Sequence, residues 1–222
     1  MIERTSIADI QAATNTAIDN ILEHDRDEMA IPSYLHSNPL IRLLMWKRYD
    51  TVSEMLIAGS DKQALEFGCG VGLFLSHLCA NYSQVFALDL FPQYAQALMR
   101  QKNLAPNFIQ HLNDIEDGSL DTIVAADVLE HIEELDEYLA LFHRKLKTDG
   151  QLLVSGPTEN VLYKLGRQVA GFGDKGDYHH TNIDNLIAAI SNAGFHCLET
   201  KKLPFPVLPG LFKICHFHKT SG

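Results

Sequence analysis

Three glycines at alternate positions are the residues of this sequence that point most directly to chemistry. Gly68, Gly70 and Gly72 follow the apolar run of residues 63–67, in which Glu66 lies two residues before the first glycine. Glycine allows a tight backbone turn and lets a ligand approach where a Cβ would intrude. A helical pattern begins directly afterwards, and a helix N-terminus presents unpaired N–H groups. The stretch therefore predicts a strand, a ligand-binding loop and a helix.

An acidic residue closes the next apolar run. Asp89 follows residues 84–88 and lies 17 positions after Gly72. A carboxylate at the tip of the second strand can accept two hydrogen bonds from a ribose diol, as in related nucleotide-binding folds. Its alternative role is that of a turn residue with no ligand. The register with the glycine loop favours the ribose role.

Strand and helix patterns alternate along the rest of the chain. The expected strands are residues 63–67, 84–89, 108–111, 120–127 and 151–155, and the helices between and after them are 92–102, 135–146 and 183–192. This alternation predicts an α/β layered sheet with mostly parallel strands. Two further strands, 195–201 and 211–218, are separated by a proline-rich connection that suits an antiparallel final strand.

The composition of the chain bears on three properties: nucleic-acid binding, cellular compartment and membrane insertion. A net charge of −10 and a pI of about 5.5 argue against an extended nucleic-acid surface. Four cysteines without a C-x-x-C pair predict reduced thiols and a cytoplasmic protein. No apolar run reaches the ~18 residues of a membrane span, and the first residues lack the pattern of a signal peptide.

The Glu-x-Gly-x-Gly-x-Gly pattern at the end of a strand resembles motif I of the class I S-adenosylmethionine-dependent methyltransferases. The resemblance covers about residues 63–218. Residues 127–131 and 150–154 resemble the small-molecule branch, which includes quinone-biosynthesis O-methyltransferases. The resemblance implies a Rossmann-like fold: a seven-stranded, mostly parallel, doubly wound sheet with an antiparallel last strand.

The resemblance also implies S-adenosylmethionine as cofactor and a set of residues that bind it. In that family an Asp after the third strand meets the adenine amino group and the next residue packs on the ring, which here are Asp114 and Ile115. Asp114 is equally suited to an Asx turn. The full predicted set is Glu66, Gly68, Cys69, Gly70, Gly72, Asp89, Leu90, Asp114, Ile115 and Asp127.

The implied reaction is in-line displacement of a methyl group onto a small-molecule acceptor, with oxygen as the favoured atom, leaving S-adenosylhomocysteine. The protein must hold the nucleophile near ~3–3.5 Å from the methyl carbon and exclude water. A hydroxyl of high pKa also needs a proton acceptor, for which His131, His179 and His180 are candidates. Each of them has a structural alternative, as a helix cap or as a solvated loop residue.

Residues 1–58 lie outside the resemblance. Their apolar spacing predicts a helix over 6–29 and a second one opened by Asn38-Pro39. We interpret residues 1–58 as a helical cover over the cofactor cleft and 59–222 as the S-adenosylmethionine-binding domain. The irregular segment 158–182 is expected to join this cover, because it follows the fifth strand at the edge where ligands bind.

The element Asp127-x-x-Glu130-His131 resembles the acidic-x-x-Glu-His element that binds a divalent ion in some quinone-biosynthesis and RNA-end methyltransferases. Here Asp stands where Glu is usual. The alternative is that Asp127 caps a helix whose first turn holds the other two residues. This alternative is favoured, and no metal ligand is predicted.

Two other functions use the same elements. A nicotinamide-dependent oxidoreductase would need its third glycine at position 73, which is Leu73, and a Tyr-x-x-x-Lys pair that does not follow the fifth strand. A non-catalytic cofactor-binding protein would keep the fold without turnover. The oligomeric state is left open by the sequence.

Overall fold

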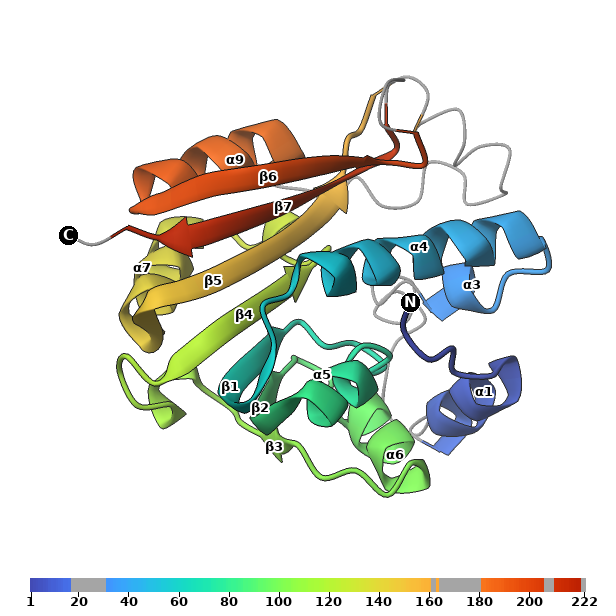
Figure 1. Ribbon diagram of the computed structural model, residues 1–222. Helices are drawn as coiled ribbons and strands as arrows, with labels where there is room; N and C mark the ends of the chain where they lie inside the picture. Colours follow the sequence, from blue (N-terminus) through green and yellow to red (C-terminus); the bar gives the residue numbers. More distant parts are fainter. Residues whose placement is uncertain (17–30, 161–162, 164–180, 206–209, 221–222) are drawn as a thin grey trace.

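A seven-stranded sheet forms the middle layer of the chain, in the order β3-β2-β1-β4-β5-β7-β6 (Figure 1). The computed structural model describes residues 1–16, 31–160, 163, 181–205 and 210–220. The strands are β1 Gly59–Phe67, β2 Tyr82–Leu88, β3 Asn107–Phe108, β4 Leu120–Ala126, β5 Leu146–Pro157, β6 Phe195–Leu203 and β7 Phe212–Lys219. Strand β7 runs antiparallel to both of its neighbours, β5 and β6, and the other strand pairs are parallel, which confirms the predicted sheet.

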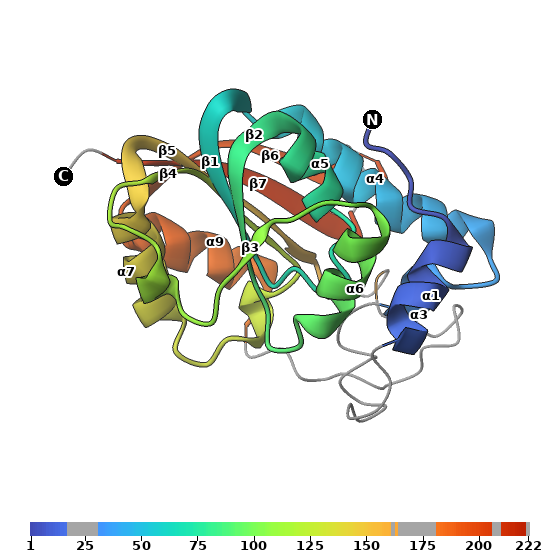
Figure 2. The same cartoon turned by 90° about the horizontal axis from the view of Figure 1, so that it is seen from below.

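Helices cover both faces of the sheet (Figure 2). One face carries α4 Pro39–Met55, α5 Leu75–Asn81 and α6 Gln93–Gln101, and the other carries α7 Leu135–Lys145 and α9 Ile183–Asn192. Successive strand residues point to opposite faces. Ala64 of β1 therefore packs in the α4 layer, whereas Leu65 packs under α7 and α9.

The strand order reverses between β1 and β4. The chain leaves β1 toward β2 and β3 on one side and later continues from β4 to β5 on the other. Loops after these parallel strands therefore diverge at one edge, and ligands of open α/β sheets bind at such a switch point. The glycine loop follows β1 directly, so the fold places it at this edge.

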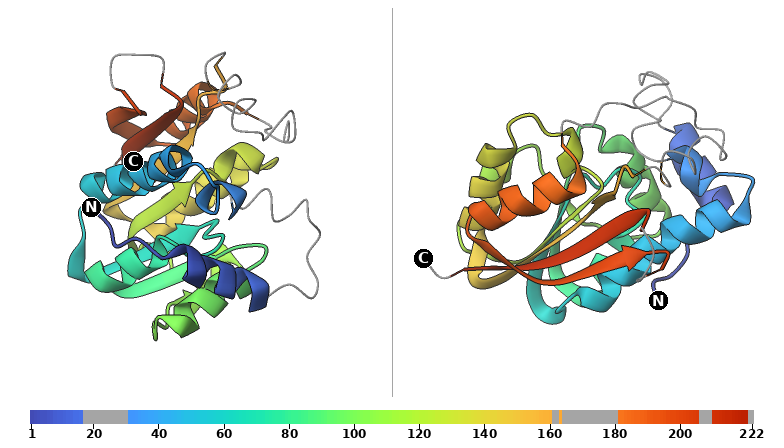
Figure 3. Two further views of the ribbon diagram at one scale, coloured as in Figure 1. Left: turned by 90° about the vertical axis from the view of Figure 1, so that its right-hand side faces the viewer. Right: turned by 90° about the horizontal axis from the view of Figure 1, so that it is seen from above.

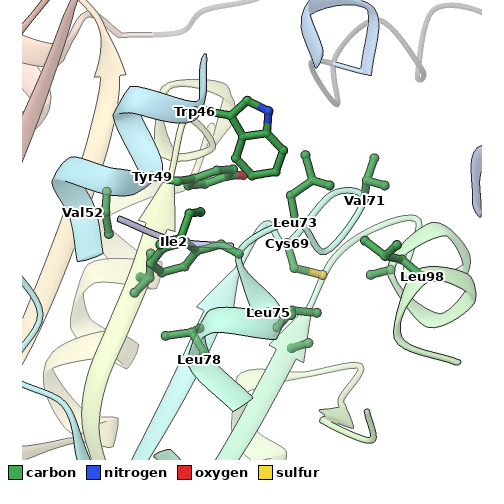
Figure 4. Close-up of a cluster of buried hydrophobic side chains, with 14 of the residues drawn as sticks. Ile2, Trp46, Tyr49, Val52, Cys69, Val71, Leu73, Leu75, Leu78 and Leu98 are labelled. Atoms are coloured by element: carbon green, nitrogen blue, oxygen red, sulfur yellow. The ribbon is translucent and has the colours of Figure 1, made fainter. Parts of the chain in front are cut away.

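Helix α4 begins where the sequence predicts. The side chain of Asn38 accepts a hydrogen bond from the N–H of Leu40, and Pro39 occupies the first turn. Its buried side includes Trp46, Tyr49 and Val52, which lie over the residues that follow β1 (Figure 4). The helix thus shares one hydrophobic core with the sheet, across β5, β7 and β6.

The first helix is described only in part. Helix α1, Ile7–Thr16, packs against α6, and the rest of the predicted helix, residues 17–30, lies outside the described residues. A short helix α3, Ile31–Tyr34, precedes α4. Both α1 and α3 lie beyond the carboxyl ends of the parallel strands (Figures 1 and 3). Most of the predicted irregular segment 158–182 also lies outside the described residues.

Several local expectations needed correction. Strand β3 has two residues instead of the four predicted. Helix α9 has the predicted range, and its N-cap is Asn182, whose side chain accepts hydrogen bonds from two backbone N–H groups. Strand β7 is not at an edge, because it inserts between β5 and β6. His216 of β7 is consequently only 7% exposed.

The carboxylate of Asp50 fastens the N-terminal segment to α4. It accepts a hydrogen bond from the N–H of Ile2 at 2.9 Å and pairs with the guanidinium of Arg4. Asp50 is 3% exposed, so its loss leaves a buried N–H and a cation without their partner.

We expect Asp50→Ala to lower the free energy of unfolding by about 1–3 kcal/mol, the cost of an unmade buried hydrogen bond. Urea denaturation measures this, and amide exchange should quicken at residues 2–5. Glu54→Ala is the matched control on the same helix. Glu54 pairs with Lys47 and with Lys201, each at 3.7 Å and at a half-exposed position, and its removal should cost under ~1 kcal/mol. Equal losses in the two variants would contradict the anchoring role.

Candidate active site

The glycine loop, residues 68–72, is fastened to the end of β2. The N–H groups of Gly68 and Cys69 both donate to the carbonyl of Leu88, at 2.8 and 3.3 Å. All three glycines have positive φ, at +73°, +52° and +80° in chain order. Residues with a Cβ adopt positive φ only at a cost in free energy. The three glycines therefore stand at the loop positions where the backbone needs positive φ.

Two of these glycines are also required by packing. A Cβ on Gly68 would lie 2.5 Å from the side chain of Val128, which follows β4. A Cβ on Gly72 would lie 3.0 Å from Ala95 of α6. The loop therefore needs glycine to fit against its neighbours as well as to admit a ligand.

Asp89 holds the middle of the loop. Its carboxylate accepts hydrogen bonds from the N–H of Gly70 at 2.7 Å and from that of Phe91 at 2.8 Å. Burial raises its pKa, and these two hydrogen bonds oppose the rise. Each carboxylate oxygen has a second lone pair with which to accept a ligand hydroxyl. Leu90, the next residue, is 87% exposed at the same edge.

Glu66 places a second carboxyl group under the loop. It is 2% exposed, and its Oε2 atom has no hydrogen-bond partner among the described residues. Burial, and then the charge of Asp89, raise its pKa well above the usual value. Cys69 is buried beside them, and burial likewise raises the pKa of its thiol well above normal. Two close carboxyl groups of this kind favour a ligand that carries positive charge.

Asp114 and Ile115 lie in and after the short 3-10 helix η2, Leu112–Asp114. The carboxylate of Asp114 accepts hydrogen bonds from the N–H groups of His111 at 3.0 Å and Gln110 at 3.3 Å, which are turn contacts. Ile115 is 2% exposed and packs in the core under α7. Because the side chain of Ile115 points into the core, an adenine ring at this position would contact the backbone of Ile115. The adenine role of both residues stays a prediction.

Asp127 joins three elements at the end of β4. Its backbone has φ +54°, and its N–H donates to the carbonyl of Ser155 in β5 at 2.9 Å. The hydroxyl of Ser155 donates to Oδ1 at 2.7 Å, and the guanidinium of Arg48 in α4 forms an ion pair with Oδ2. The carboxylate thus links the switch-point edge to α4, and it does not cap the turn that follows.

Glu130 and His131 lie in that turn, the 3-10 helix η3 Leu129–His131. Glu130 is 3% exposed, and its Oε2 has no hydrogen-bond partner in the described part of the chain. Burial raises its pKa to about 7; its backbone hydrogen bond and Arg48 oppose the rise, and Glu159 adds to it. His131 is partly exposed in the same turn. His179 and His180 lie outside the described residues.

A family model described as a methyltransferase domain matches residues 41–200. The chain belongs to this family. The matched range begins inside α4 and ends in β6, so it contains the glycine loop, Asp89 and Asp127. The prediction of a class I methyltransferase, with S-adenosylmethionine as its cofactor, is confirmed.

Individual relatives agree with this family. A mitochondrial ubiquinone biosynthesis O-methyltransferase from Schizosaccharomyces pombe is 25% identical over 57% of this chain and 50% of its own length. One from Xanthomonas euvesicatoria is 28% identical over 66% of this chain and 67% of its own. The chain thus spans about half the length of the first of these relatives. A solved methyltransferase from Aquifex aeolicus shares the fold, with a TM-score of 0.65, 16% identity, and coverage of 87% and 98% of the two chains.

The residues of this methyltransferase domain fit its cofactor. S-adenosylmethionine supplies a methyl group on a cationic sulfonium and also carries an amino group and a ribose diol. Glu66 offers a buried, unpartnered oxygen, and Asp89 offers acceptor positions at the loop. The carboxyl pair would compensate that positive charge.

Arg48 is the site residue that the sequence interpretation missed. In the sequence it is one of three clustered basic residues in an acidic protein. Its position is informative, because it lies three residues after Met45 and four before Val52, both buried. A charged residue in the apolar stripe of a helix is rarely buried unless it is paired. That signal could have predicted a buried carboxylate partner, although not which one.

We expect Glu130 to make stability depend on pH. Its pKa is about 7 in the folded chain, above the ordinary 4.5, so the folded state binds the proton more tightly. Stability should therefore be highest at low pH and fall as the pH rises from about 4.5 to about 7. Glu130→Gln removes this decline and should recover up to ~3 kcal/mol at alkaline pH relative to acid pH.

Urea denaturation of both proteins at about pH 5 and about pH 8 measures the difference. The exposed Glu116→Gln is the control and should leave the pH dependence unchanged. Parallel pH profiles for the wild type and Glu130→Gln would rule out a buried, ionisable Glu130.

Proposed function

We propose that this chain transfers a methyl group from S-adenosylmethionine to an oxygen of a small-molecule acceptor. The observation that carries the proposal is the glycine loop at the switch point, with Asp89 bonded to its middle N–H and Glu66 beneath it. The family match gives the reaction class, and the relatives' names support oxygen as the methylated atom. Their names also favour an acceptor of the quinone-precursor type.

The cofactor roles are proposed residue by residue. Asp89 would accept hydrogen bonds from the ribose hydroxyls, and Glu66 would compensate positive charge on the donor. Leu90, exposed beside Asp89, suits contact with the adenine. Asp114 would meet the adenine amino group, and Ile115 would pack on the ring. The remaining predicted residues, Gly68, Cys69, Gly70, Gly72 and Asp127, would shape the loop and the edge around it.

The acceptor would lie between this edge and the N-terminal helices. We propose that residues 1–58 cover the site and that 59–222 hold the cofactor. The positions of α1 and α3 beyond the strand ends and the packing of Tyr49 on Phe74, with ring centroids 5.1 Å apart, support a cover that excludes water. His131 is the proposed proton acceptor among the described residues, because it lies at the same edge.

Titration calorimetry with S-adenosylhomocysteine tests the cofactor, and labelled methyl transfer to a panel of catechols and phenols tests the reaction. We expect saturable binding and transfer to at least one phenolic oxygen. Absence of binding at millimolar ligand would refute the function. A titration with NADH is the control for the oxidoreductase alternative. Binding without transfer across the panel would favour a non-catalytic protein.

A cytoplasmic location is also proposed. The four cysteines are free, and two of them are buried in the core, which suits a reducing compartment. Within the described ranges no helix has the length and apolar character that crossing a membrane requires.

A further inference from the structure

The acidic residues after β4 already have a cation, which the chain itself supplies. Arg48 reaches from α4 to the carboxylate of Asp127, and its side chain is 3% exposed. On the other side of Asp127, the hydroxyl of Ser155 donates to Oδ1 at 2.7 Å. Both carboxylate oxygens are thus engaged by donors from two different elements.

Arg48 is held in this position from several directions. Its Nη2 donates to the hydroxyl of Tyr34 at 3.0 Å. Its guanidinium carbon lies 5.1 Å from the ring centre of Phe212 and 5.6 Å from that of Tyr49. A guanidinium over aromatic faces gains cation–π attraction, and buried Arg is stable only when it is compensated in this way. The cation is therefore fixed by α3, α4 and β7 together.

The same arrangement does not fit a divalent ion. Mg²⁺ takes six oxygen ligands in near-octahedral geometry and keeps several waters, so it needs free carboxylate oxygens and room around them. At Asp127 that position is filled by Arg48 and Ser155. Over the ranges that the structure describes, no group of three or more His, Cys, Asp or Glu side chains is arranged to hold a metal.

We propose that Arg48 takes the place of a divalent cation at the Asp127-x-x-Glu130-His131 element, so that this chain needs no metal there. Arg48 is then a positioning residue, because its pairing with Asp127 also holds α4 over the edge of the sheet. Cation binding at this element is independent of the proposed function, whereas the positioning of the cover rests on that function.

A variant without Arg48 should bind a divalent ion at this element. Removal of the guanidinium leaves the partly exposed Asp127 and the buried Glu130 near it without a compensating cation, which is costly. A small divalent ion with its waters could then enter and restore neutrality. Arg48→Met, which keeps side-chain length without charge, should therefore create a metal site that the wild type lacks.

Binding of Mn²⁺ alone, followed by electron paramagnetic resonance, tests this without any substrate. We expect no specific Mn²⁺ binding at this element by the wild type or by Arg48→Lys, which keeps the charge. Arg48→Met should bind Mn²⁺ tighter by on the order of tenfold or more, since a cation replaces a lost one. Asp127→Asn added to Arg48→Met should abolish the gain.

Two results would overturn the proposal. One is Mn²⁺ binding by the wild type that Asp127→Asn removes, and this arm needs no Arg48 variant to fold. The other is a folded Arg48→Met with no gain in Mn²⁺ binding; if that variant unfolds, Arg48→Gln takes its place. Calorimetry with S-adenosylhomocysteine on the wild type is run in parallel. Its failure would refute the methyltransferase function and leave the Mn²⁺ result standing.

Discussion

Asp89→Ala is expected to weaken S-adenosylhomocysteine binding by about 1.5–3 kcal/mol, the range for hydrogen bonds to a charged group. This corresponds to roughly 10–150-fold in the dissociation constant. The variant loses the proposed ribose acceptor. It also frees the N–H of Gly70, which Asp89 holds at 2.7 Å, so the loop loses a fixed conformation. Calorimetry on the folded variant gives the affinity.

Asp121→Ala is the matched control for this measurement. Asp121 also ties strands together, because its carboxylate accepts a hydrogen bond from the N–H of Gln63 at 2.9 Å. It lies at the start of β4, at the opposite edge from the glycine loop. Its loss should lower stability and leave the affinity unchanged. An Asp89→Ala protein that is folded and binds normally would remove Asp89 from the cofactor site.

Gly68→Ala should destabilise the fold by about 2–5 kcal/mol. The new Cβ would lie 2.5 Å from Cγ2 and 2.6 Å from Cβ of Val128, so the backbone or that side chain must move. Such overpacking costs about 1–3 kcal/mol, and the left-handed φ adds roughly 1–2 kcal/mol. Urea denaturation measures the total, which is a large part of the ~5–15 kcal/mol of a typical domain.

Two further variants separate clash from backbone strain. Gly118 has φ +63°, and a Cβ added there would meet no atom within 4 Å, so Gly118→Ala should show the strain alone. Combining Gly68→Ala with Val128→Ala should recover part of the loss, because neighbouring substitutions are not additive. Equal losses at the two glycines, or no recovery in the double variant, would show that Val128 does not require the glycine.

The sequence by itself determined the elements that are predicted to bind the cofactor. The strand, the glycine loop and the following helix are contiguous, so their local signals sufficed to predict them. Asp89 follows the next strand, and parallel strands bring their carboxyl ends to one edge, so its place beside the loop followed from topology. The start of α4 was likewise readable from Asn38-Pro39, because caps are local. The family match, residues 41–200, agrees with these elements.

Only the tertiary structure decided which residues surround the predicted cofactor-binding loop and Asp89. The strand pattern in the sequence does not show which of the two C-terminal strands pairs with β5. In the structure β7 pairs with β5 and lies between β5 and β6. The need for glycine at position 68 comes from Val128, which is far along the chain. The partner of Asp127 is Arg48, on a helix that precedes the alternating strands and helices of the sheet. Periodicity shows that a side chain is buried, but a contact between distant residues depends on how the elements pack, which no local pattern encodes.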